Sequence, residues 1–212
     1  MKYIYLIFVL VFNCFSKVNE KQIINYTKTN VKHDNTSIIY RDSIIKVAKS
    51  FCIKHKMDTT IAIVINYKIH SGLKRGFIIQ LYNGKTLDSF MVSHGCGDSA
   101  WGSDETKNKP KFSNEFESHC SSLGKYKLYG RAYSDWGINV KYIMKGLDKT
   151  NSNAYSRTIV LHSWESVTND EIYPKGTAEG WGCPAVSNST MLYLDSLLSK
   201  KKKPVLMWLY YQ

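Results

Sequence analysis

The chain has 212 residues, of which 43% are hydrophobic and 22% charged, so it can form an apolar core and is neither disordered nor collagen-like. At roughly 100–200 residues per domain, this length fits one domain with a short leading segment. Lysine and arginine outnumber aspartate and glutamate by 29 to 17, giving a formal net charge of +12. The excess predicts an anionic partner, although charge alone does not distinguish nucleic acid, acidic lipid and an anionic wall polymer.

The first sixteen residues are typical of an export signal. Lys2 precedes an uninterrupted apolar run, Tyr3–Phe12, and a short segment ending at Ser16 separates this run from the polar Lys17. The run is about ten residues long, whereas a membrane-spanning helix needs roughly 20. We therefore expect residues 1–16 to be a cleaved signal peptide and not a transmembrane anchor.

Cleavage after this signal would leave two further segments. Residues 17–37 are polar and lack periodicity, which predicts a flexible lead-in, and residues 38–212 form the expected folded domain. Alternatively, Cys14 could become the lipid-modified first residue of a bacterial lipoprotein. Either route predicts an exported protein of the bacterial periplasm or cell envelope.

The first half of the domain contains one helical pattern followed by strand patterns. Between Tyr40 and Met57, apolar residues recur at helical spacing and predict a helix with one buried face. Cys52 lies on that face, so we expect a core thiol rather than a reactive or bridged one. The pattern then alternates, and an Asn-Gly hairpin signal follows. Three consecutive strands are predicted, at Thr60–Ile69, Gly76–Tyr82 and Lys85–Ser93.

The second half begins with a long segment, Gly95–Tyr126, that is rich in Gly, Ser, Asn and Asp. Long loops in compact domains are usually functional. A helix is predicted at Thr190–Ser199, and a central buried strand at Pro204–Tyr211 because both of its faces are apolar. Further strands are predicted at Lys125–Tyr129, Gly137–Tyr142 and Thr158–His162. The predicted fold class is mainly β with two or three short peripheral helices.

The pattern that carries chemistry is His162, at the end of a predicted strand, followed by Gly-Trp-Gly-Cys-Pro at residues 180–184. A cysteine nucleophile needs a base, backbone N–H groups for the oxyanion, and exposure. The glycines permit a sharp turn. The candidate roles are nucleophile for Cys183, base for His162, and oxyanion donors for the backbone of Trp181 and Gly182. From residue types alone, a buried or disulfide-bonded Cys183 is an equal alternative.

A series of short motifs follows one order along about residues 59–210. They are Ile65-Asn66-Tyr67 with Ser71-Gly72 and Arg75, Val92-Ser93-His94-Gly95, Phe112-Ser113-Asn114, Ser121-Ser122-Leu123-Gly124, Gly146-Leu147-Asp148, Arg157 to His162, and Gly182-Cys183-Pro184. In this order they resemble the catalytic domain of the murein L,D-transpeptidase family (YkuD-type). The resemblance implies a YkuD-like β-sandwich or barrel.

By this resemblance, the chain is expected to be an enzyme of peptidoglycan remodelling. Cys183 would attack the L,D-peptide bond of a tetrapeptide stem, and an amine of a neighbouring stem would resolve the acyl-enzyme with proton transfer by His162. An L,D-carboxypeptidase or endopeptidase using the same pair is one alternative. A catalytically inactive wall-binding module is the other. We expect a monomer that binds peptidoglycan stem peptides and no nucleic acid, without a metal or organic cofactor.

The chain departs from the family pattern at two positions and contains a competing motif. Gly180 stands where the family usually has Ser, and Ser163 stands where Gly is commoner. The segment Ser93-His94-Gly95-Cys96 matches the general form of the family's nucleophile motif more literally than the segment around Cys183. If Cys96 were the nucleophile, His70 would be its candidate base. However, the helix and strand that follow the nucleophile in the family follow only Cys183, which we therefore favour.

Cys96 and Cys120 lie in or beside the long loop. In an exported protein we expect them to form a disulfide, which would contribute roughly 3 kcal/mol. The alternative is a metal site of His94, Cys96 and either His119 or Cys120, because a His-x-Cys pair can place two ligands on one side of a strand. No fourth ligand is evident, so the disulfide is favoured.

Stem peptides carry carboxylates, so cationic and polar side chains are expected to hold them. The candidate substrate-binding residues are Arg157, Ser163, Asn114, Ser122 and Arg131. Each of the charged and loop residues has an alternative role in surface charge or loop capping.

Overall fold

The computed structural model describes residues 43–212, and the expected signal peptide and lead-in lie outside the described residues. A helix covers residues 43–54, and two further helical segments follow later in the chain, η1 (Lys149–Asn151) and α2 (Asn188–Leu198). The strands are β1 (Ile61–Asn66), β2 (Gly76–Gln80), β3 (Thr86–Phe90), β4 (Gly124–Tyr133), β5 (Val140–Gly146), β6 (Val160–Ser163), β7 (Ala185–Val186) and β8 (Val205–Tyr210).

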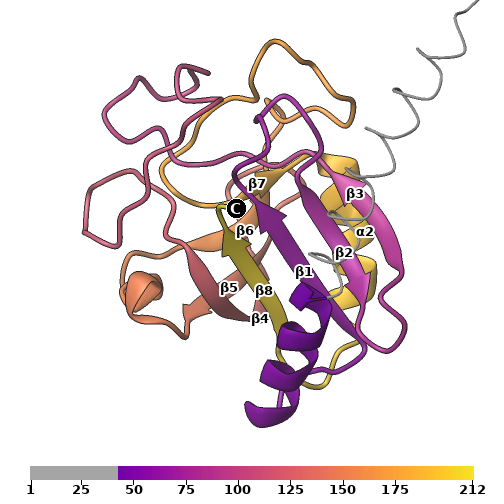
Figure 1. Ribbon diagram of the computed structural model, residues 1–212. Coiled ribbons are helices and arrows are strands. Elements are labelled where there is room, and N and C mark those ends of the chain that lie inside the picture. The colour runs from indigo at the N-terminus through magenta and orange to yellow at the C-terminus, as the bar shows by residue number, and fades with distance from the viewer. Residues whose placement is uncertain (1–42) are drawn as a thin grey trace, which may run out of the picture. The chain divides into compact units, whose positions relative to one another are not determined.

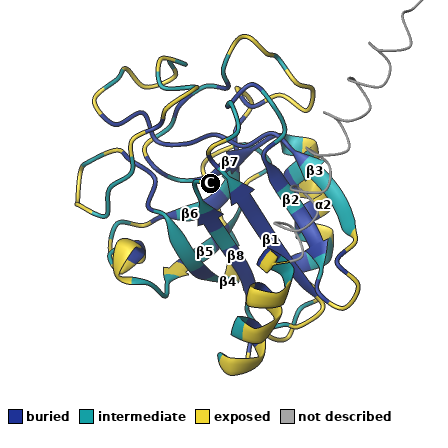
Figure 2. Ribbon diagram, in the orientation of Figure 1, coloured by how far each residue is buried: buried dark blue, intermediate teal, exposed yellow. Residues whose placement is uncertain are grey.

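The eight strands within residues 43–212 belong to one sheet, in the order β3-β2-β1-β8-β4-β5-β6-β7. The sheet forms a nearly closed barrel or sandwich, and the fold is mainly β as predicted. β8 lies in the middle, parallel to β1 and antiparallel to β4 (Figure 1). Most of its residues are buried (Figure 2), which confirms the expected central strand.

The predicted three-strand meander is also confirmed, because β1 pairs antiparallel with β2 and β2 with β3. β4 is longer than predicted. The pairing of β4 with β5 shifts register at Gly130, whose φ of 62° is easily adopted by glycine, and the strand continues beyond this bulge to Tyr133. The sequence pattern did not predict β7, whose two residues are too few to show a period.

The helix at residues 43–54 and α2 both contribute apolar side chains to the protein core. Ala48 and Cys52 pack in a cluster with Leu206 of β8. Burial raises the pKa of Cys52 to about 12, so this cysteine is a core thiol as predicted. At α2, the hydroxyl of the N-cap Ser187 accepts a hydrogen bond from the Thr190 amide, which fixes the start of the helix.

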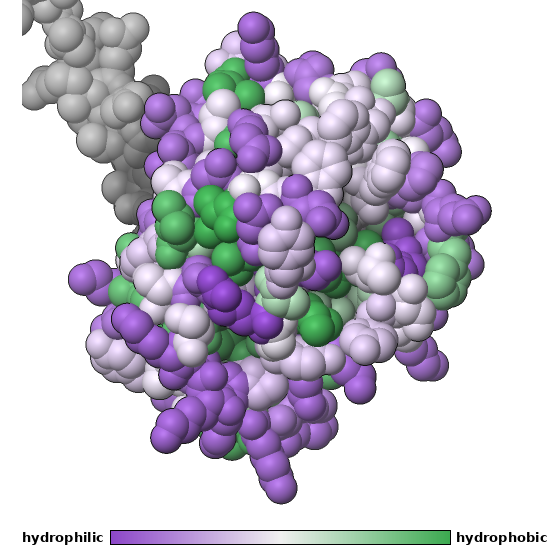
Figure 3. Space-filling model, turned by 180° about the vertical axis from the view of Figure 1, so that it is seen from behind, coloured by the Kyte–Doolittle hydropathy of each residue, from purple (hydrophilic) through white to green (hydrophobic). Residues whose placement is uncertain are grey.

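Two long irregular segments, 91–123 and 164–184, lie at the same end of the sheet (Figure 1). The first contains the predicted long loop. The second leads from β6 to β7 and contains Cys183. Seen from behind (Figure 3), the surface is mainly hydrophilic, and hydrophobic residues lie in small groups between polar ones. The two irregular segments therefore form the part of the molecule where a site can be built.

Candidate active site

Cys183 lies in a turn whose two ends are fixed by hydrogen bonds to the segment after β3. The Gly180 amide donates to the His94 carbonyl (2.8 Å), and the Cys96 amide donates to the Gly180 carbonyl (2.7 Å). Two residues after Cys183, the Ala185 amide donates to Ser93 Oγ (3.0 Å). The competing motif at residues 93–96 thus has a structural role, because it is hydrogen-bonded to the segment that carries Cys183.

Glycine is required at position 182 because the backbone there lies very close to the backbone of Cys120. The φ of Gly182 is +98°, and a Cβ at this position would lie 2.5 Å from the carbonyl oxygen of Cys120. Its own carbonyl accepts a hydrogen bond from Ser121 Oγ (3.0 Å). Gly180 differs, because a Cβ there would meet nothing within 4 Å. The position where the family usually has Ser therefore has space for a side chain.

His162 lies on β6 and pairs in register with Ala185 of β7 and Lys141 of β5. Its Nδ1 atom lies 3.0 Å from the carbonyl oxygen of Ser163. A carbonyl can only accept, so Nδ1 carries the proton and Nε2 has a free lone pair. Burial lowers the pKa of His162, although the Ser163 carbonyl opposes the shift. The imidazole is thus neutral at pH 7, with its proton on Nδ1, so Nε2 can act as a base.

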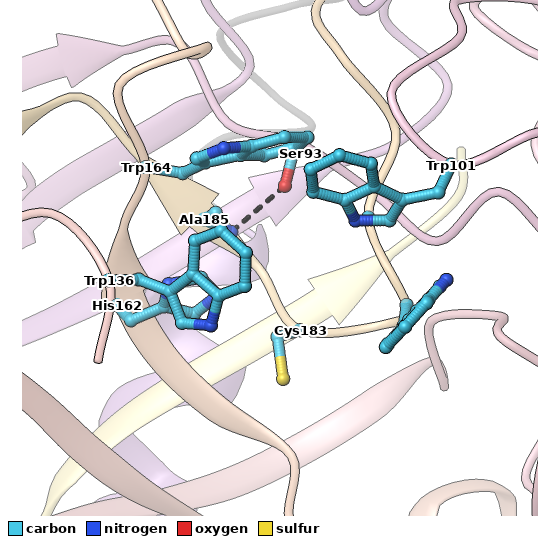
Figure 4. Close-up of a pocket in the computed structure, with 9 residues that line it drawn as sticks. Ser93, Trp101, Trp136, His162, Trp164, Cys183 and Ala185 are labelled. Atoms are coloured by element: carbon cyan, nitrogen blue, oxygen red, sulfur yellow. Dashed lines mark hydrogen bonds between the residues drawn. The ribbon is translucent and has the colours of Figure 1, made fainter. Parts of the chain in front are cut away.

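The sulfur of Cys183 contacts the chain at the start of β6. It lies 3.4 Å from the Val160 amide, which donates to it, and 3.9 Å from the Thr158 carbonyl. Burial raises the pKa of this thiol, while the Val160 N–H and the positive charges of Arg157 and Lys141 act in the opposite direction. In Figure 4 the sulfur points away from the ring of Trp164.

Two cavities meet at Cys183 and His162. The smaller, about 120 Å³, is lined mainly by aromatic rings; the larger, about 530 Å³, has charged residues in its wall. Cys183, His162, Trp136 and Trp181 line both. The nucleophile and base proposed from the sequence are therefore accessible from two sides.

Four tryptophans surround the smaller cavity. Trp101 stacks on Trp164 with ring centroids 4.9 Å apart, and Trp136 and Trp181 lie within 6.5 Å of Trp101. Figure 4 shows the labelled rings of Trp101, Trp136 and Trp164 around the space beside Cys183. No sequence pattern indicated Trp101 or Trp136, because their segments lie far from Cys183 in the chain. Their exposed fractions, 48% and 46%, leave surface for a ligand.

Arg157 lines the larger cavity, but its guanidinium is already engaged. Nη1 donates to the Ser113 carbonyl (3.0 Å) and Ser122 Oγ (2.8 Å). Nη2 donates to Ser118 Oγ (3.2 Å) and the Cys120 carbonyl (2.8 Å). Arg157 therefore anchors the long loop with both terminal nitrogens, which cannot form a bidentate pair with a substrate carboxylate.

The other expected substrate-binding residues lie elsewhere. Ser122 is buried beneath Arg157, and Arg131 forms an ion pair with Asp195 of α2 (2.8 Å). The Asn114 amide bonds to the η1 region, including the Lys149 carbonyl (3.2 Å). The Ser163 hydroxyl is buried and accepts from the Ile138 amide (3.0 Å). Ser122, Arg131, Asn114 and Ser163 are not among the residues that line the two described cavities.

The alternative nucleophile Cys96 lines neither described cavity. It is buried, which raises the pKa of its thiol. His94 accepts at Nδ1 from Arg75 (2.8 Å), so its proton is on Nε2, which faces Thr106 Oγ1 (2.7 Å). Burial and the Arg75 charge hold the pKa of His94 well below its usual value. His70, the candidate base for Cys96, has its Nδ1 atom occupied by the Gly72 N–H (2.9 Å).

This buried polar network also joins the long loop to the segment that precedes Cys183. The Glu179 carboxylate accepts from the amide (2.6 Å) and the hydroxyl (3.0 Å) of Thr106. Arg75, His94 and Glu179 are all buried, so their hydrogen bonds are needed to offset desolvation. The sequence identified Arg75 and His94 within motifs but gave no signal for Glu179.

The expected disulfide is absent from the structure, where Cys96 and Cys120 are both free and buried thiols. The two residues nevertheless lie near each other, since a Cβ on Gly97 would be 3.3 Å from Cys120 Sγ. The alternative metal site is also not formed. Both ring nitrogens of His94 have other partners, and residues 43–212 contain no group of three metal-binding side chains.

Three backbone N–H groups next to the sulfur remain available. Among the described residues, the amides of Trp181, Gly182 and Cys183 donate to no acceptor. These donors lie in the same turn as the thiol, beside the two cavities. An arrangement of this kind can stabilise an oxyanion formed next to the sulfur.

A cysteine and an oriented histidine on a mainly β sheet are features of cysteine-dependent acyl-transfer domains. Residues 31–208 match the family described as L,D-transpeptidase catalytic domain, and the chain belongs to that family. This confirms the resemblance found in the sequence. The family is one of L,D-transpeptidase-like enzymes related to peptidoglycan. The matched range begins before residue 38, where the folded domain was expected to start.

Solved structures with similar folds share little sequence with this chain. Bd1075 of Bdellovibrio bacteriovorus has 10% identity over 73% of this chain and 48% of its own, with a TM-score of 0.44. An L,D-transpeptidase (residues 123–326) of Xylanimonas cellulosilytica has 14% identity, coverages of 71% and 60%, and a TM-score of 0.39. The helical cell shape determining protein Pgp2 of Campylobacter jejuni has 11% identity, coverages of 72% and 48%, and a TM-score of 0.43.

This chain thus spans between about half and three fifths of the length of those solved chains. Among curated proteins, no significant match was found. The helices within residues 43–212 are too short or too polar to cross a membrane.

Proposed function

We propose that this chain is an exported L,D-transpeptidase that forms an acyl-enzyme on Cys183 and transfers a peptidoglycan stem peptide to an amine. The observation that carries the proposal is that Cys183 and His162 together line two cavities, with the imidazole fixed at Nδ1 by the Ser163 carbonyl. Nε2 of the neutral ring is free to accept the thiol proton. The family membership supports peptidoglycan as the class of substrate.

In the acylation step, His162 takes the proton of Cys183, and the thiolate attacks the carbonyl carbon of the L,D-peptide bond in a tetrapeptide stem. The oxygen of the tetrahedral intermediate accepts hydrogen bonds from amides of the turn at residues 181–183. The C–N bond breaks, the imidazolium returns its proton to the leaving amine, and D-alanine departs. A thioester then joins the stem to Cys183.

The resting orientation of the sulfur requires one adjustment before this step. The Val160 amide holds Sγ at 3.4 Å, on the side of the larger cavity. For the acylation step Sγ must face Nε2 of His162, and the χ1 torsion of Cys183 is the bond that can reorient it. Catalytic hydrogen bonds commonly tighten only when substrate is bound.

In the second step, the amine of a neighbouring stem attacks the thioester carbon and gives its proton to His162. The C–S bond breaks, and the thiol is restored. Two cavities that share Cys183 and His162 favour transfer, because each can take one of the two peptides. Water in place of the amine would give carboxypeptidase activity through the same acyl-enzyme.

Export is part of the same proposal, since the substrate lies outside the cytoplasm. An apolar run of about ten residues near the amino terminus and the formal net charge of +12 support a protein that is exported and acts on the acidic cell envelope. Cys14 remains the alternative point of lipid attachment.

Product analysis tests this function. Purified protein is incubated with a disaccharide tetrapeptide, alone and with a second stem as acceptor, and the products are resolved by mass spectrometry. We expect D-alanine release and a cross-linked dimer. Tripeptide without dimer would assign hydrolysis. Binding to sacculi without any product would identify an inactive wall-binding module.

A further inference from the structure

Lys141 is placed beside the proposed base by the pairing of two strands. It is the second residue of β5 and is the register partner of His162 on β6. Paired residues of antiparallel strands have their side chains on the same face of the sheet, and their Cα atoms are about 4.5–5.5 Å apart. Lys141 and His162 accordingly both line the larger cavity.

Lys141 differs from Arg157, the other cation of this cavity, because its ammonium group forms no hydrogen bond or ion pair within the described residues. Arg157 uses both terminal nitrogens within the protein. The ammonium of Lys141 has no hydrogen bond or ion pair with any residue in the described range, including the cavity residues Glu117 and Asp135. A half-buried cation beside a nucleophile and without an anion of its own is positioned to receive one from a ligand.

The charge of Lys141 acts on both members of the proposed pair. It lowers the pKa of Cys183 and also that of His162, where it acts after burial and the Ser163 carbonyl. Both effects are consistent with an ammonium close to the reacting atoms.

We propose that Lys141 binds the terminal carboxylate of the residue that leaves during acylation. This inference rests on the proposed function. In the scissile L,D-peptide bond, the nitrogen that receives the proton from His162 is separated from the terminal carboxylate by one Cα atom. A group that holds this carboxylate must therefore lie next to His162 and within the same cavity, and Lys141 does so.

The contact would also set the length of the donor. A stem with one residue after the scissile bond places its carboxylate at Lys141, whereas a longer stem places an uncharged amide there. Lys141 would thus select stems that end one residue after the bond that is cut.

The test compares Lys141→Met with wild type on two donors: a tetrapeptide with a free terminal carboxylate and the same peptide with a terminal carboxamide. Lys145→Met is the matched control, because Lys145 is an exposed lysine of the same strand and lines neither cavity. We expect Lys141→Met to lower kcat/KM about 10- to 100-fold on the free acid, which is the usual effect of losing one charge-assisted hydrogen bond. On the carboxamide, the loss in Lys141→Met should be much smaller than on the free acid, because only the effect of the Lys141 charge on Cys183 and His162 remains there. Lys141→Arg should recover most of the activity on the free acid.

A loss that is the same on both donors would overturn the proposal and assign Lys141 an effect on Cys183 and His162 alone. An unchanged kcat/KM for Lys141→Met on the free acid would also overturn it. A third donor carries an amide in place of the side-chain carboxylate of its diaminopimelate residue. If the difference in kcat/KM between wild type and Lys141→Met disappears only on this donor, Lys141 binds the side-chain carboxylate and not the terminal one. In each of these cases wild-type turnover leaves the proposed function intact, whereas absence of turnover by wild type contradicts the function itself.

Discussion

The Nδ1 atom of His162 and the main-chain oxygen of Ser163 lie 3.0 Å apart, so a residue next to the imidazole in the sequence determines its tautomer. The Ser163 side chain does not take part in this contact. Its hydroxyl accepts from the Ile138 amide on the buried side of the strand. The departure from the glycine common in the family therefore leaves the orienting group unchanged.

Ser163→Ala should consequently separate stability from activity. The variant keeps the carbonyl that fixes His162 but loses the acceptor of the Ile138 amide, so the free energy of unfolding should fall by about 1–2 kcal/mol. Its kcat/KM should stay close to wild type, whereas His162→Gln should lose about 10²–10⁴-fold. Urea unfolding and D-alanine release measure the two quantities. A folded Ser163→Ala that is as inactive as His162→Gln would disprove this assignment of the carbonyl.

Gly180 and Gly182 should respond differently to the same change. Gly180→Ala adds a methyl group into open space and should change the unfolding free energy by less than about 1 kcal/mol. Gly182→Ala requires φ near +98° and brings Cβ to 2.5 Å from the Cys120 carbonyl, so it should destabilise the chain by more than about 2 kcal/mol. Thermal unfolding of both variants checks the contrast. Equal stabilities would contradict the close approach at Gly182.

Arg157 and Arg131 provide a second matched pair. Arg157→Met removes four hydrogen bonds to the long loop and leaves acceptors unpaired, which should cost about 2–4 kcal/mol and make residues 113–122 easier to cleave by protease. Arg131→Met removes an exposed ion pair with Asp195 and should cost about 0–1 kcal/mol. Urea unfolding combined with limited proteolysis measures both. If Arg157→Met only raised KM and left the loop protected, Arg157 would be a substrate ligand instead.

The buried His94 predicts how stability depends on pH. Its folded-state pKa lies well below 6.5, so below about pH 6.5 the unfolded chain takes up a proton that the folded chain does not. The contribution of His94 is therefore complete above this pH and is lost as pH falls, by up to about 1.4 kcal/mol per pH unit. The pKa values of His162 and His70 are also lowered, so both residues contribute to the pH dependence of stability with the same sign.

His94→Gln should flatten this dependence between about pH 7 and pH 5, while His162→Gln, at a half-buried position, serves as the comparison. Urea midpoints at each pH provide the measurement. A wild-type stability that rises on acidification, or an unchanged slope in His94→Gln, would contradict a neutral buried His94.

Local patterns predicted much of this molecule. A few neighbouring residues suffice to indicate the alternating strands β1 to β3, the apolar strand β8 and the Gly-rich turn at Cys183. The proposal that His162 is the base for Cys183 rests on the order of the motifs along the chain.

The surroundings of the site could not be predicted in this way. Trp101 and Trp136 come from separate loops, and Lys141 reaches the cavity only because β5 and β6 pair in one particular register. The sequence identified Arg157 as a cation, but its acceptors come from residues 113–122 and are brought to it by the fold. Whether a charged side chain is free or engaged depends on such tertiary contacts.

Trapping the thioester tests most directly whether Cys183 is the nucleophile. Wild type, Cys183→Ala and Cys96→Ala are mixed with a disaccharide tetrapeptide, quenched in acid and analysed by intact mass and peptide mapping. We predict an adduct with the mass of the disaccharide-tripeptide acyl group on the peptide containing Cys183, in wild type and Cys96→Ala, and none in Cys183→Ala. An adduct that persists in Cys183→Ala and disappears in Cys96→Ala would contradict the assignment of the nucleophile.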